Sequence, residues 1–188
     1  MLKKSVYIVG PSSTGKTTLC MAVAKRLGVD EGRTVSEIAR NVMRTRGFTR
    51  MDIGRLEMQQ AILDAILENH EGNSVQPPRI HDRSAIDPVV YAILTATGDE
   101  EARRRKEQLF MTEKFQSALE QYRQSVFILL KPVREWITDD GIRFIEDLDK
   151  CYEMFGTVLK ECGIQFREIG TEVGFLEERV AWLMGLCS

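Results

Sequence analysis

The sequence has no long apolar run, and no stretch approaches the roughly 20 consecutive apolar residues of a membrane-spanning helix. The first four residues are too few to form a signal peptide before the first apolar stretch. Neither charge sign is in excess, because 26 Lys and Arg face 28 Asp and Glu for a formal net charge of -2. This balance argues against nucleic acid as a partner. We expect a soluble cytoplasmic protein without membrane contact.

Cysteine is also scarce, and the four cysteines lack metal-ligand spacing. Cys151 and Cys162 fall on the apolar side of one predicted helix, which indicates reduced core residues. There is no internal repeat and no low-complexity tail. With 188 residues, 43% of them hydrophobic, the chain is expected to form one domain over residues 1–188.

Short apolar runs alternate with segments of helical periodicity. Strands are predicted at 5–9, 33–36, 80–82, 125–130 and 165–169. Helices are predicted at 16–27, 37–46, 52–69, from 87 onward, at 99–123, at about 144–162 and at 172–186. Asp52 is the predicted N-cap of the third helix, and Asp87, followed by Pro88, that of the fourth. The alternation predicts an α/β fold with a parallel sheet covered by helices on both faces.

The segment GPSSTGKTTL, residues 10–19, matches G-x-x-x-x-G-K-[ST] in full between a predicted strand and a predicted helix. Its glycines allow backbone N–H groups to converge on phosphate oxygens, and the helix N-terminus adds its positive end. Lys16 would reach the β- and γ-phosphates, and the Thr17 hydroxyl would bind Mg²⁺. The predicted nucleotide-binding residues are Gly10, Ser12, Ser13, Thr14, Gly15, Lys16, Thr17 and Thr18.

The sequence after the third predicted strand distinguishes hydrolysis from transfer. Asp82 is placed to bind Mg²⁺, but Arg83 stands where a motor-type ATPase has a water-polarising glutamate. An acid followed by arginine suits a phosphotransferase: the acid binds the metal or accepts a hydroxyl proton, and the arginine neutralises the transferred phosphate. The alternative is an ordinary Asp-Arg surface pair. No guanine-reading NKxD segment follows the fourth strand, which favours ATP over GTP.

A kinase must exclude water, and residues 131–143 (KPVREWITDDGIR) are the predicted mobile lid. Arg134 or Arg143 would close onto the γ-phosphate. Alternatively, Arg134 pairs with a neighbouring aspartate and Trp136 only packs. The run Arg103–Arg105 is a rival lid, but the adjacent acids favour a solvated helical face.

Polar residues near the second strand and on the third helix predict an acceptor pocket. Glu37 ends the second strand, so it lies near the phosphate loop in a parallel sheet, with Arg40 one turn further on. Gln59 and Gln60 interrupt the apolar stripe of the third helix. Such a glutamine either faces a polar pocket or turns outward. Gln60 and Arg143 complete the predicted substrate-binding set.

Together, these segments resemble the ribosylnicotinamide-kinase-like P-loop group, which includes the kinase domain of bacterial NAD-salvage regulators. The segment Asp82–Asp87 (DRSAID) is similar to the DRS-x-x-D of eukaryotic "AAA domain" proteins. The resemblance runs from Val6 to about Gly170. It implies a three-layer P-loop NTPase fold, a five-stranded sheet of order 2-3-1-4-5, ATP and Mg²⁺, and phosphoryl transfer to a nucleoside-like hydroxyl with Glu37 near the acceptor.

The sequence therefore predicts an ATP- and Mg²⁺-dependent kinase whose partners are a nucleoside triphosphate and a small-molecule acceptor, such as a ribosylnicotinamide-like compound. The predicted catalytic residues are Lys16, Asp82, Arg83 and Arg134; Thr17 and Asp82 would hold the metal. The base is either Glu37 or Asp82. The alternative function is a nucleotide-binding switch that hydrolyses ATP or GTP slowly and acts through a protein partner.

Overall fold

A computed structural model describes residues 2–28, 34–35, 38–71, 78–133 and 147–187. Its five strands form one parallel sheet. In spatial order they are β2 (Thr34–Val35), β3 (Ile80–Asp82), β1 (Val6–Val9), β4 (Val126–Leu130) and β5 (Phe166–Ile169). The parallel α/β prediction is therefore confirmed, and the order is the one that the resemblance implies.

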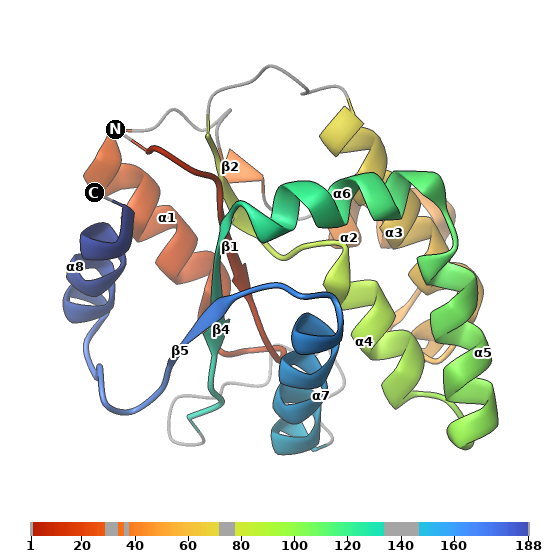
Figure 1. Ribbon diagram of the computed structural model, residues 1–188. Coiled ribbons are helices and arrows are strands. Elements are labelled where there is room, and N and C mark those ends of the chain that lie inside the picture. The colour runs from red at the N-terminus through yellow and green to blue at the C-terminus, as the bar shows by residue number, and fades with distance from the viewer. Residues whose placement is uncertain (1, 29–33, 36–37, 72–77, 134–146, 188) are drawn as a thin grey trace.

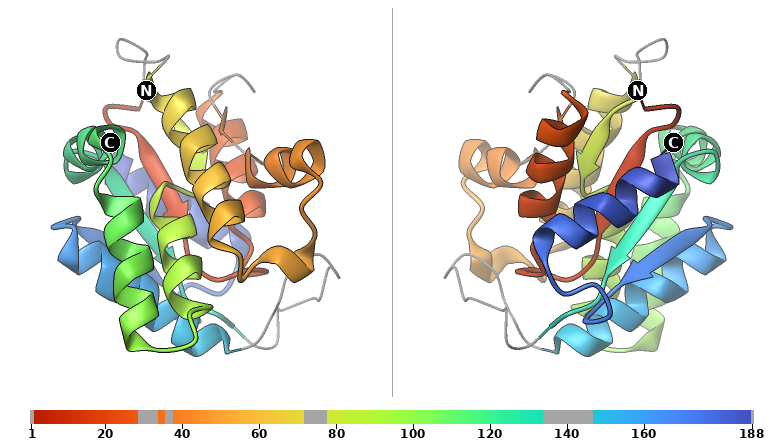
Figure 2. Two further views of the ribbon diagram at one scale, coloured as in Figure 1. Left: turned by 90° about the vertical axis from the view of Figure 1, so that its right-hand side faces the viewer. Right: turned by 90° about the vertical axis from the view of Figure 1, so that its left-hand side faces the viewer.

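Helices cover both faces of the sheet, as Figures 1 and 2 show. In chain order they are α1 (Lys16–Leu27), α2 (Ile38–Arg46), the 3₁₀ turn η2 (Arg50–Asp52), α3 (Leu56–Glu71), α4 (Ile86–Leu94), α5 (Asp99–Phe110), α6 (Glu113–Arg123), α7 (Leu148–Glu161) and α8 (Leu176–Cys187). Helices α1 and α8 lie together on one face, and α3, α4, α6 and α7 lie on the other. No helix in the described part of the chain is long and apolar enough to cross a membrane.

Alternation along β1 divides the core into two layers. Val6 and Ile8 face α1 and α8, whereas Tyr7 and Val9 face the larger helical layer. Successive strand residues point to opposite faces, so a strand buried on both sides is apolar throughout. In the register of the sheet, Ile8 lies opposite Asp82 of β3. The sheet thus brings the end of β3 beside the segment that follows β1.

Two predicted helix starts are wrong by a few residues. Asp52 is not the N-cap of α3; its carboxylate accepts hydrogen bonds from the backbone and hydroxyl of Thr49, both at 2.8 Å, in a capping box around η2. The helix α3 then starts at Leu56. Asp87 lies inside the first turn of α4, and its carboxylate accepts from the backbone N–H of Ser84 at 2.8 Å. In both cases the aspartate caps its turn from inside rather than from the preceding position.

The charged stretch 99–123 is two helices rather than one. Helix α5 ends at Phe110, and the Thr112 hydroxyl accepts a hydrogen bond from Phe115 N–H at 3.3 Å to start α6. The sequence carries no glycine or proline at this break. A threonine N-cap is therefore the local signal for the second helix. The break lets α5 pack on α4 and lets α6 pack on α3.

Candidate active site

The loop between β1 and α1 is the predicted phosphate cradle, and its backbone is shaped by two glycines. Gly10 has φ 135°, and a Cβ there would lie 2.8 Å from the backbone oxygen of Leu130 on β4. Gly15 has φ 84° and is the N-cap of α1, so it offers the first N–H groups of the helix no side-chain acceptor. Such N–H groups form an anion site.

Side chains of the loop bond to the loop itself. The Thr14 hydroxyl donates to the backbone oxygen of Pro11 at 2.9 Å. The Lys16 ammonium donates to the same oxygen and lies 3.5 Å from Thr14 Oγ1. Lys16 is only 3% exposed, so its charge is held at the loop before any phosphate arrives. Thr18 is exposed at the start of α1.

Thr17, in the first turn of α1, meets Asp82 at the end of β3. The Thr17 hydroxyl donates to Asp82 Oδ2. The other carboxylate oxygen, Oδ1, is buried and has no hydrogen-bond partner among the described residues. A buried acceptor without a partner is costly, and a cation would satisfy it. The pair fits Mg²⁺, which takes few protein oxygens and fills its remaining positions with phosphates and water. The described residues hold no cluster of three or more His, Cys, Asp or Glu for a metal bound by protein alone.

The residue after Asp82 is held in an unusual conformation. Arg83 has φ 91°, which bulky side chains rarely adopt and which costs about 1–3 kcal/mol. Its Nη1 donates to Asp87 Oδ1 at 3.1 Å, and the two side chains are 14% and 4% exposed. Asp87 Oδ2 accepts from Ser84 N–H and from the Ser84 hydroxyl. Arg83 is therefore held in a buried, hydrogen-bonded ion pair with Asp87.

Electrostatics tie this pair to the phosphate loop. Burial raises the pKa of Asp87 above its ordinary value, while the charges of Arg83 and Lys16 oppose that rise. Burial alone would lower the pKa of Arg83, but Asp87, Tyr91 and Asp82 hold it above its usual range. Arg83 is thus a permanent cation within the electrostatic reach of the residues that bind phosphate and metal.

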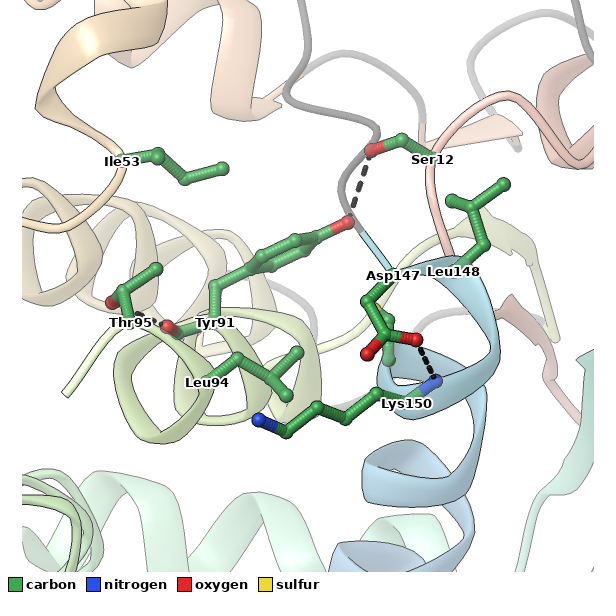
Figure 3. Close-up of a pocket in the computed structure, with 9 residues that line it drawn as sticks. Ser12, Ile53, Tyr91, Leu94, Thr95, Asp147, Leu148 and Lys150 are labelled. Atoms are coloured by element: carbon green, nitrogen blue, oxygen red, sulfur yellow. Dashed lines mark hydrogen bonds between the residues drawn. The ribbon is translucent and has the colours of Figure 1, made fainter. Parts of the chain in front are cut away.

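A cavity of about 430 Å³ opens beside the loop, between α4 and the start of α7 (Figure 3). It is lined by Ser12, Ile53, Tyr91, Leu94, Thr95, Asp147, Leu148, Lys150 and Cys151. The Tyr91 ring extends from α4 toward the loop, and its hydroxyl lies 3.0 Å from Ser12 Oγ in a hydrogen bond. The lining is mixed: apolar walls on three elements, hydroxyls at the loop, and Asp147 and Lys150 exposed at α7. A volume in this range fits a small metabolite.

Burial also governs the titratable groups of the cavity wall. Burial raises the pKa of Tyr91, and it raises the pKa of the Cys151 thiol to about 12. The charges of Lys16 and Arg83 reach Cys151, and the charge of Arg83 reaches Tyr91. The phosphate loop, the buried ion pair and the cavity therefore form one electrostatic unit, and both wall groups stay neutral at physiological pH.

The predicted substrate residues fare differently. Gln60 does not reach this cavity: its amide donates to Asp64 at 2.9 Å, and it lines a separate groove of about 240 Å³ on the outer side of α3. Gln59 is buried and donates to the backbone oxygen of Ile53 at 2.8 Å, so it braces the segment before α3. Arg40 lies partly buried on α2. Glu37, Arg134, Trp136 and Arg143 lie outside the described residues.

Tyr91 and Ile53 are site residues that the sequence reasoning missed. Arg83, Asp87 and Tyr91 are spaced by four, which places them on one side of the turn and helix that follow β3. That spacing was the available signal for Tyr91. Ile53 carries no comparable signal, because it reaches the cavity only where its segment meets the end of α4, at Gly54 and Thr95.

Comparison with known proteins agrees with this architecture. No curated protein sequence matches this chain. The structure of NadR protein in complex with NR superposes with a TM-score of 0.73 at 20% identity, over 98% of this chain and 51% of the NadR chain. This chain thus spans about half the length of NadR. At these identities, this likeness and those below show the fold.

Two further structures match over nearly their whole length. Deoxyadenosine kinase from M. mycoides with bound dATP gives a TM-score of 0.59 at 14% identity, over 97% of this chain and 98% of that one. Shikimate kinase from Acinetobacter baumannii in complex with shikimate gives 0.51 at 15% identity, over 97% and 92%. The P-loop kinase architecture is therefore shared with enzymes that act on chemically different acceptors.

The sequence itself settles the family. The family model described as AAA domain matches residues 5–179, which include the phosphate loop, Asp82, the Arg83–Asp87 pair and the cavity. With this match and the fold of the P-loop kinases, the chain belongs to the AAA domain family.

Proposed function

We propose that this protein is a kinase that transfers the γ-phosphoryl group of ATP, with Mg²⁺, to a hydroxyl of a small nucleoside-like metabolite. The observation that carries the proposal is that the cavity shares a wall with the phosphate loop. Ser12 belongs to both, and Tyr91 bonds to it at 3.0 Å from the cavity side. A donor held by the loop and an acceptor held in the cavity would therefore meet at Ser12.

Each group is assigned a role, which the geometry supports for the described residues only. Lys16 and the loop amides would hold the phosphates, while Thr17 and Asp82 would hold Mg²⁺, which neutralises phosphate charge. Arg83, fixed by Asp87, would stabilise the charge that spreads over the transferred phosphoryl group. Asp82 and Glu37 are the two candidates for the group that accepts the hydroxyl proton. Arg134 or Arg143 would close onto the γ-phosphate if residues 131–143 form the expected lid; both arginines lie outside the described residues.

The apolar walls favour a ring-bearing acceptor. Ile53, Leu94 and Leu148 offer aliphatic surface, and the Tyr91 ring offers an aromatic face. The hydroxyls of Ser12 and Thr95, which line the same cavity, suit a sugar. A nucleoside supplies both parts, and a ribosylnicotinamide-like compound is one such nucleoside.

A coupled assay of ADP release tests the proposal. Purified protein with ATP and Mg²⁺ is offered ribosylnicotinamide, deoxyadenosine and shikimate in parallel, and phosphorylated product is identified by mass spectrometry. We expect a nucleoside to stimulate ADP release and shikimate not to. Slow, acceptor-independent hydrolysis with tight nucleotide binding would refute the kinase and favour the regulatory switch. If a nucleoside is phosphorylated, Glu37→Ala should raise the KM for that nucleoside more than the KM for ATP.

A further inference from the structure

A buried arginine on α5 ties together two walls of the cavity. Arg105 is the third member of the run Arg103–Arg105, which the sequence indicates as a solvated face. The side chains of Arg103 and Arg104 are indeed 71% and 70% exposed, but that of Arg105 is only 10% exposed. A buried guanidinium needs acceptors for its donors, so its partners reveal what it does.

The partners of Arg105 come from three segments. Its Nη1 donates to the backbone oxygen of Gly54 at 3.0 Å, to that of Ala92 at 3.3 Å and to Thr95 Oγ1 at 3.2 Å. On the other side, Nε and Nη2 lie 3.0 and 2.8 Å from Glu101 Oε1. One side chain thus connects α5 to the end of α4 and to the segment between η2 and α3.

The anchor on α5 is itself held in place. Glu101 accepts hydrogen bonds from the backbone and hydroxyl of Thr97 at 2.8 and 2.5 Å. Hydrogen bonds from Thr97 and from Arg105 lower the pKa of Glu101 to about 2, so the carboxylate stays charged near neutral pH. The Glu101 carboxylate therefore orients the guanidinium of Arg105, and the Nη1 group donates to α4 and to Gly54 on the other side.

The atoms that Arg105 joins adjoin the cavity lining. Thr95 lines the cavity directly, and Gly54 follows the lining residue Ile53. The two segments touch there, since a Cβ on Gly54 would lie 3.8 Å from the Thr95 Cβ. In Figure 3, Ile53 and Thr95 lie on the same side of the cavity, across from Ser12 and Leu148. The bonds of Arg105 thus fix the position of Ile53 relative to α4.

We propose that Arg105 is a positioning residue that sets the width of the acceptor cavity, and so determines how tightly the acceptor is held and which acceptors fit. This inference rests on the proposed function. The hydrogen bonds and ion pair of Arg105 to described residues involve Glu101, Gly54, Ala92 and Thr95, and none of the phosphate-loop residues, so its contribution is specific to the acceptor side. Because Ile53 is already held in place, the free energy of acceptor binding is not reduced by the entropic cost of ordering it.

Steady-state kinetics with ribosylnicotinamide and deoxyadenosine as acceptor probes tests the proposal. Arg105→Lys keeps a cation near Glu101, but its single ammonium group cannot bond to both Gly54 and Thr95. Thr95→Val removes the hydroxyl that accepts one of the hydrogen bonds of Arg105, so it should change the kinetics in the same direction. Because charge-assisted hydrogen bonds are lost, we expect Arg105→Lys to raise the acceptor KM about tenfold. The difference in kcat/KM between ribosylnicotinamide and deoxyadenosine should become smaller. The KM for ATP should stay within about twofold, as should all constants of the matched control Arg104→Ala.

Hydrogen exchange separates this inference from the proposed function. Residues 49–56 should exchange faster in Arg105→Lys than in Arg104→Ala, whether or not the protein phosphorylates either probe. Absence of acceptor-dependent turnover in the wild type would refute the kinase and with it the role in acceptor binding. An active wild type whose Arg105→Lys variant keeps its acceptor KM, or whose KM for ATP rises equally, would overturn the positioning role. Unchanged exchange in residues 49–56 would do the same.

Discussion

Replacement of Arg83 by glycine should destabilise the protein even though it removes a strained conformation. The side chains of Arg83 and Asp87 are 14% and 4% exposed, so the loss of Arg83 leaves a buried carboxylate without its cation. Breaking such a pair costs about 3–5 kcal/mol. Glycine adopts φ 91° freely, and once its own entropic cost of about 0.5–1 kcal/mol is subtracted it recovers about 1 kcal/mol of the strain. We expect a net loss of about 2–4 kcal/mol at pH 8.

The pH dependence identifies the carboxylate responsible. Burial already raises the pKa of Asp87 above its ordinary value, and loss of Arg83 raises it further. An acid whose pKa is higher in the folded state binds more protons there, so its contribution to stability falls as pH rises from its unfolded pKa through its folded pKa. Arg83→Gly should therefore lose more stability at pH 8 than at pH 5, as measured by urea unfolding.

A double variant provides the control. In Arg83→Gly/Asp87→Asn no unpaired charge remains, so most of the stability lost at pH 8 should return and the added pH dependence should vanish. If Arg83→Gly unfolds at the same urea concentration as the wild type, or if its loss is equal at pH 5 and pH 8, the buried pair is not what holds this turn.

Three further predictions concern the phosphate loop and its contact with the cavity. Lys16→Ala should abolish turnover in the ADP-release assay while leaving the thermal midpoint of unfolding within a few degrees. Gly10→Ala should lower that midpoint and weaken ATP binding by isothermal calorimetry, because its Cβ would lie 2.8 Å from the backbone oxygen of Leu130. Tyr91→Phe removes the bond to Ser12 at 3.0 Å and should raise the acceptor KM about three- to tenfold, the equivalent of one neutral hydrogen bond; an unchanged KM would exclude the bond from acceptor binding.

The sequence pattern of the donor side can be recognised for a physical reason. A phosphate loop works through its own backbone between one strand and one helix, so the pattern is local. In the structure Gly10 has φ 135°, Lys16 donates to the loop backbone, and the end of β3 brings Asp82 to Thr17. The roles of these residues toward a nucleotide stay predictions. The short strand predicted at 80–82 is present as well, and it ends at Asp82.

The cavity is harder to predict from the sequence, because it is made by packing between distant segments. Gln60 lies on the helix expected to face the acceptor, yet its amide bonds to Asp64 on the outer side. Arg105 looks like its two exposed neighbours in the sequence, and only the packing of α5 on α4 buries it. Helical periodicity tells which residues share a face, but not which neighbour that face will meet.

The hydrogen bond between Ser12 and Tyr91 has a thermodynamic consequence. One hydroxyl group belongs to the loop that would hold the donor, and the other to the wall that would hold the acceptor. A ligand that strengthens or breaks this bond changes the free energy of binding on the opposite side. Linkage makes that effect reciprocal: the factor by which ATP tightens the acceptor must equal the factor by which the acceptor tightens ATP. Measuring the affinity for ATP and for the acceptor, each with and without the other ligand, completes a thermodynamic cycle that gives the coupling free energy between the two sites.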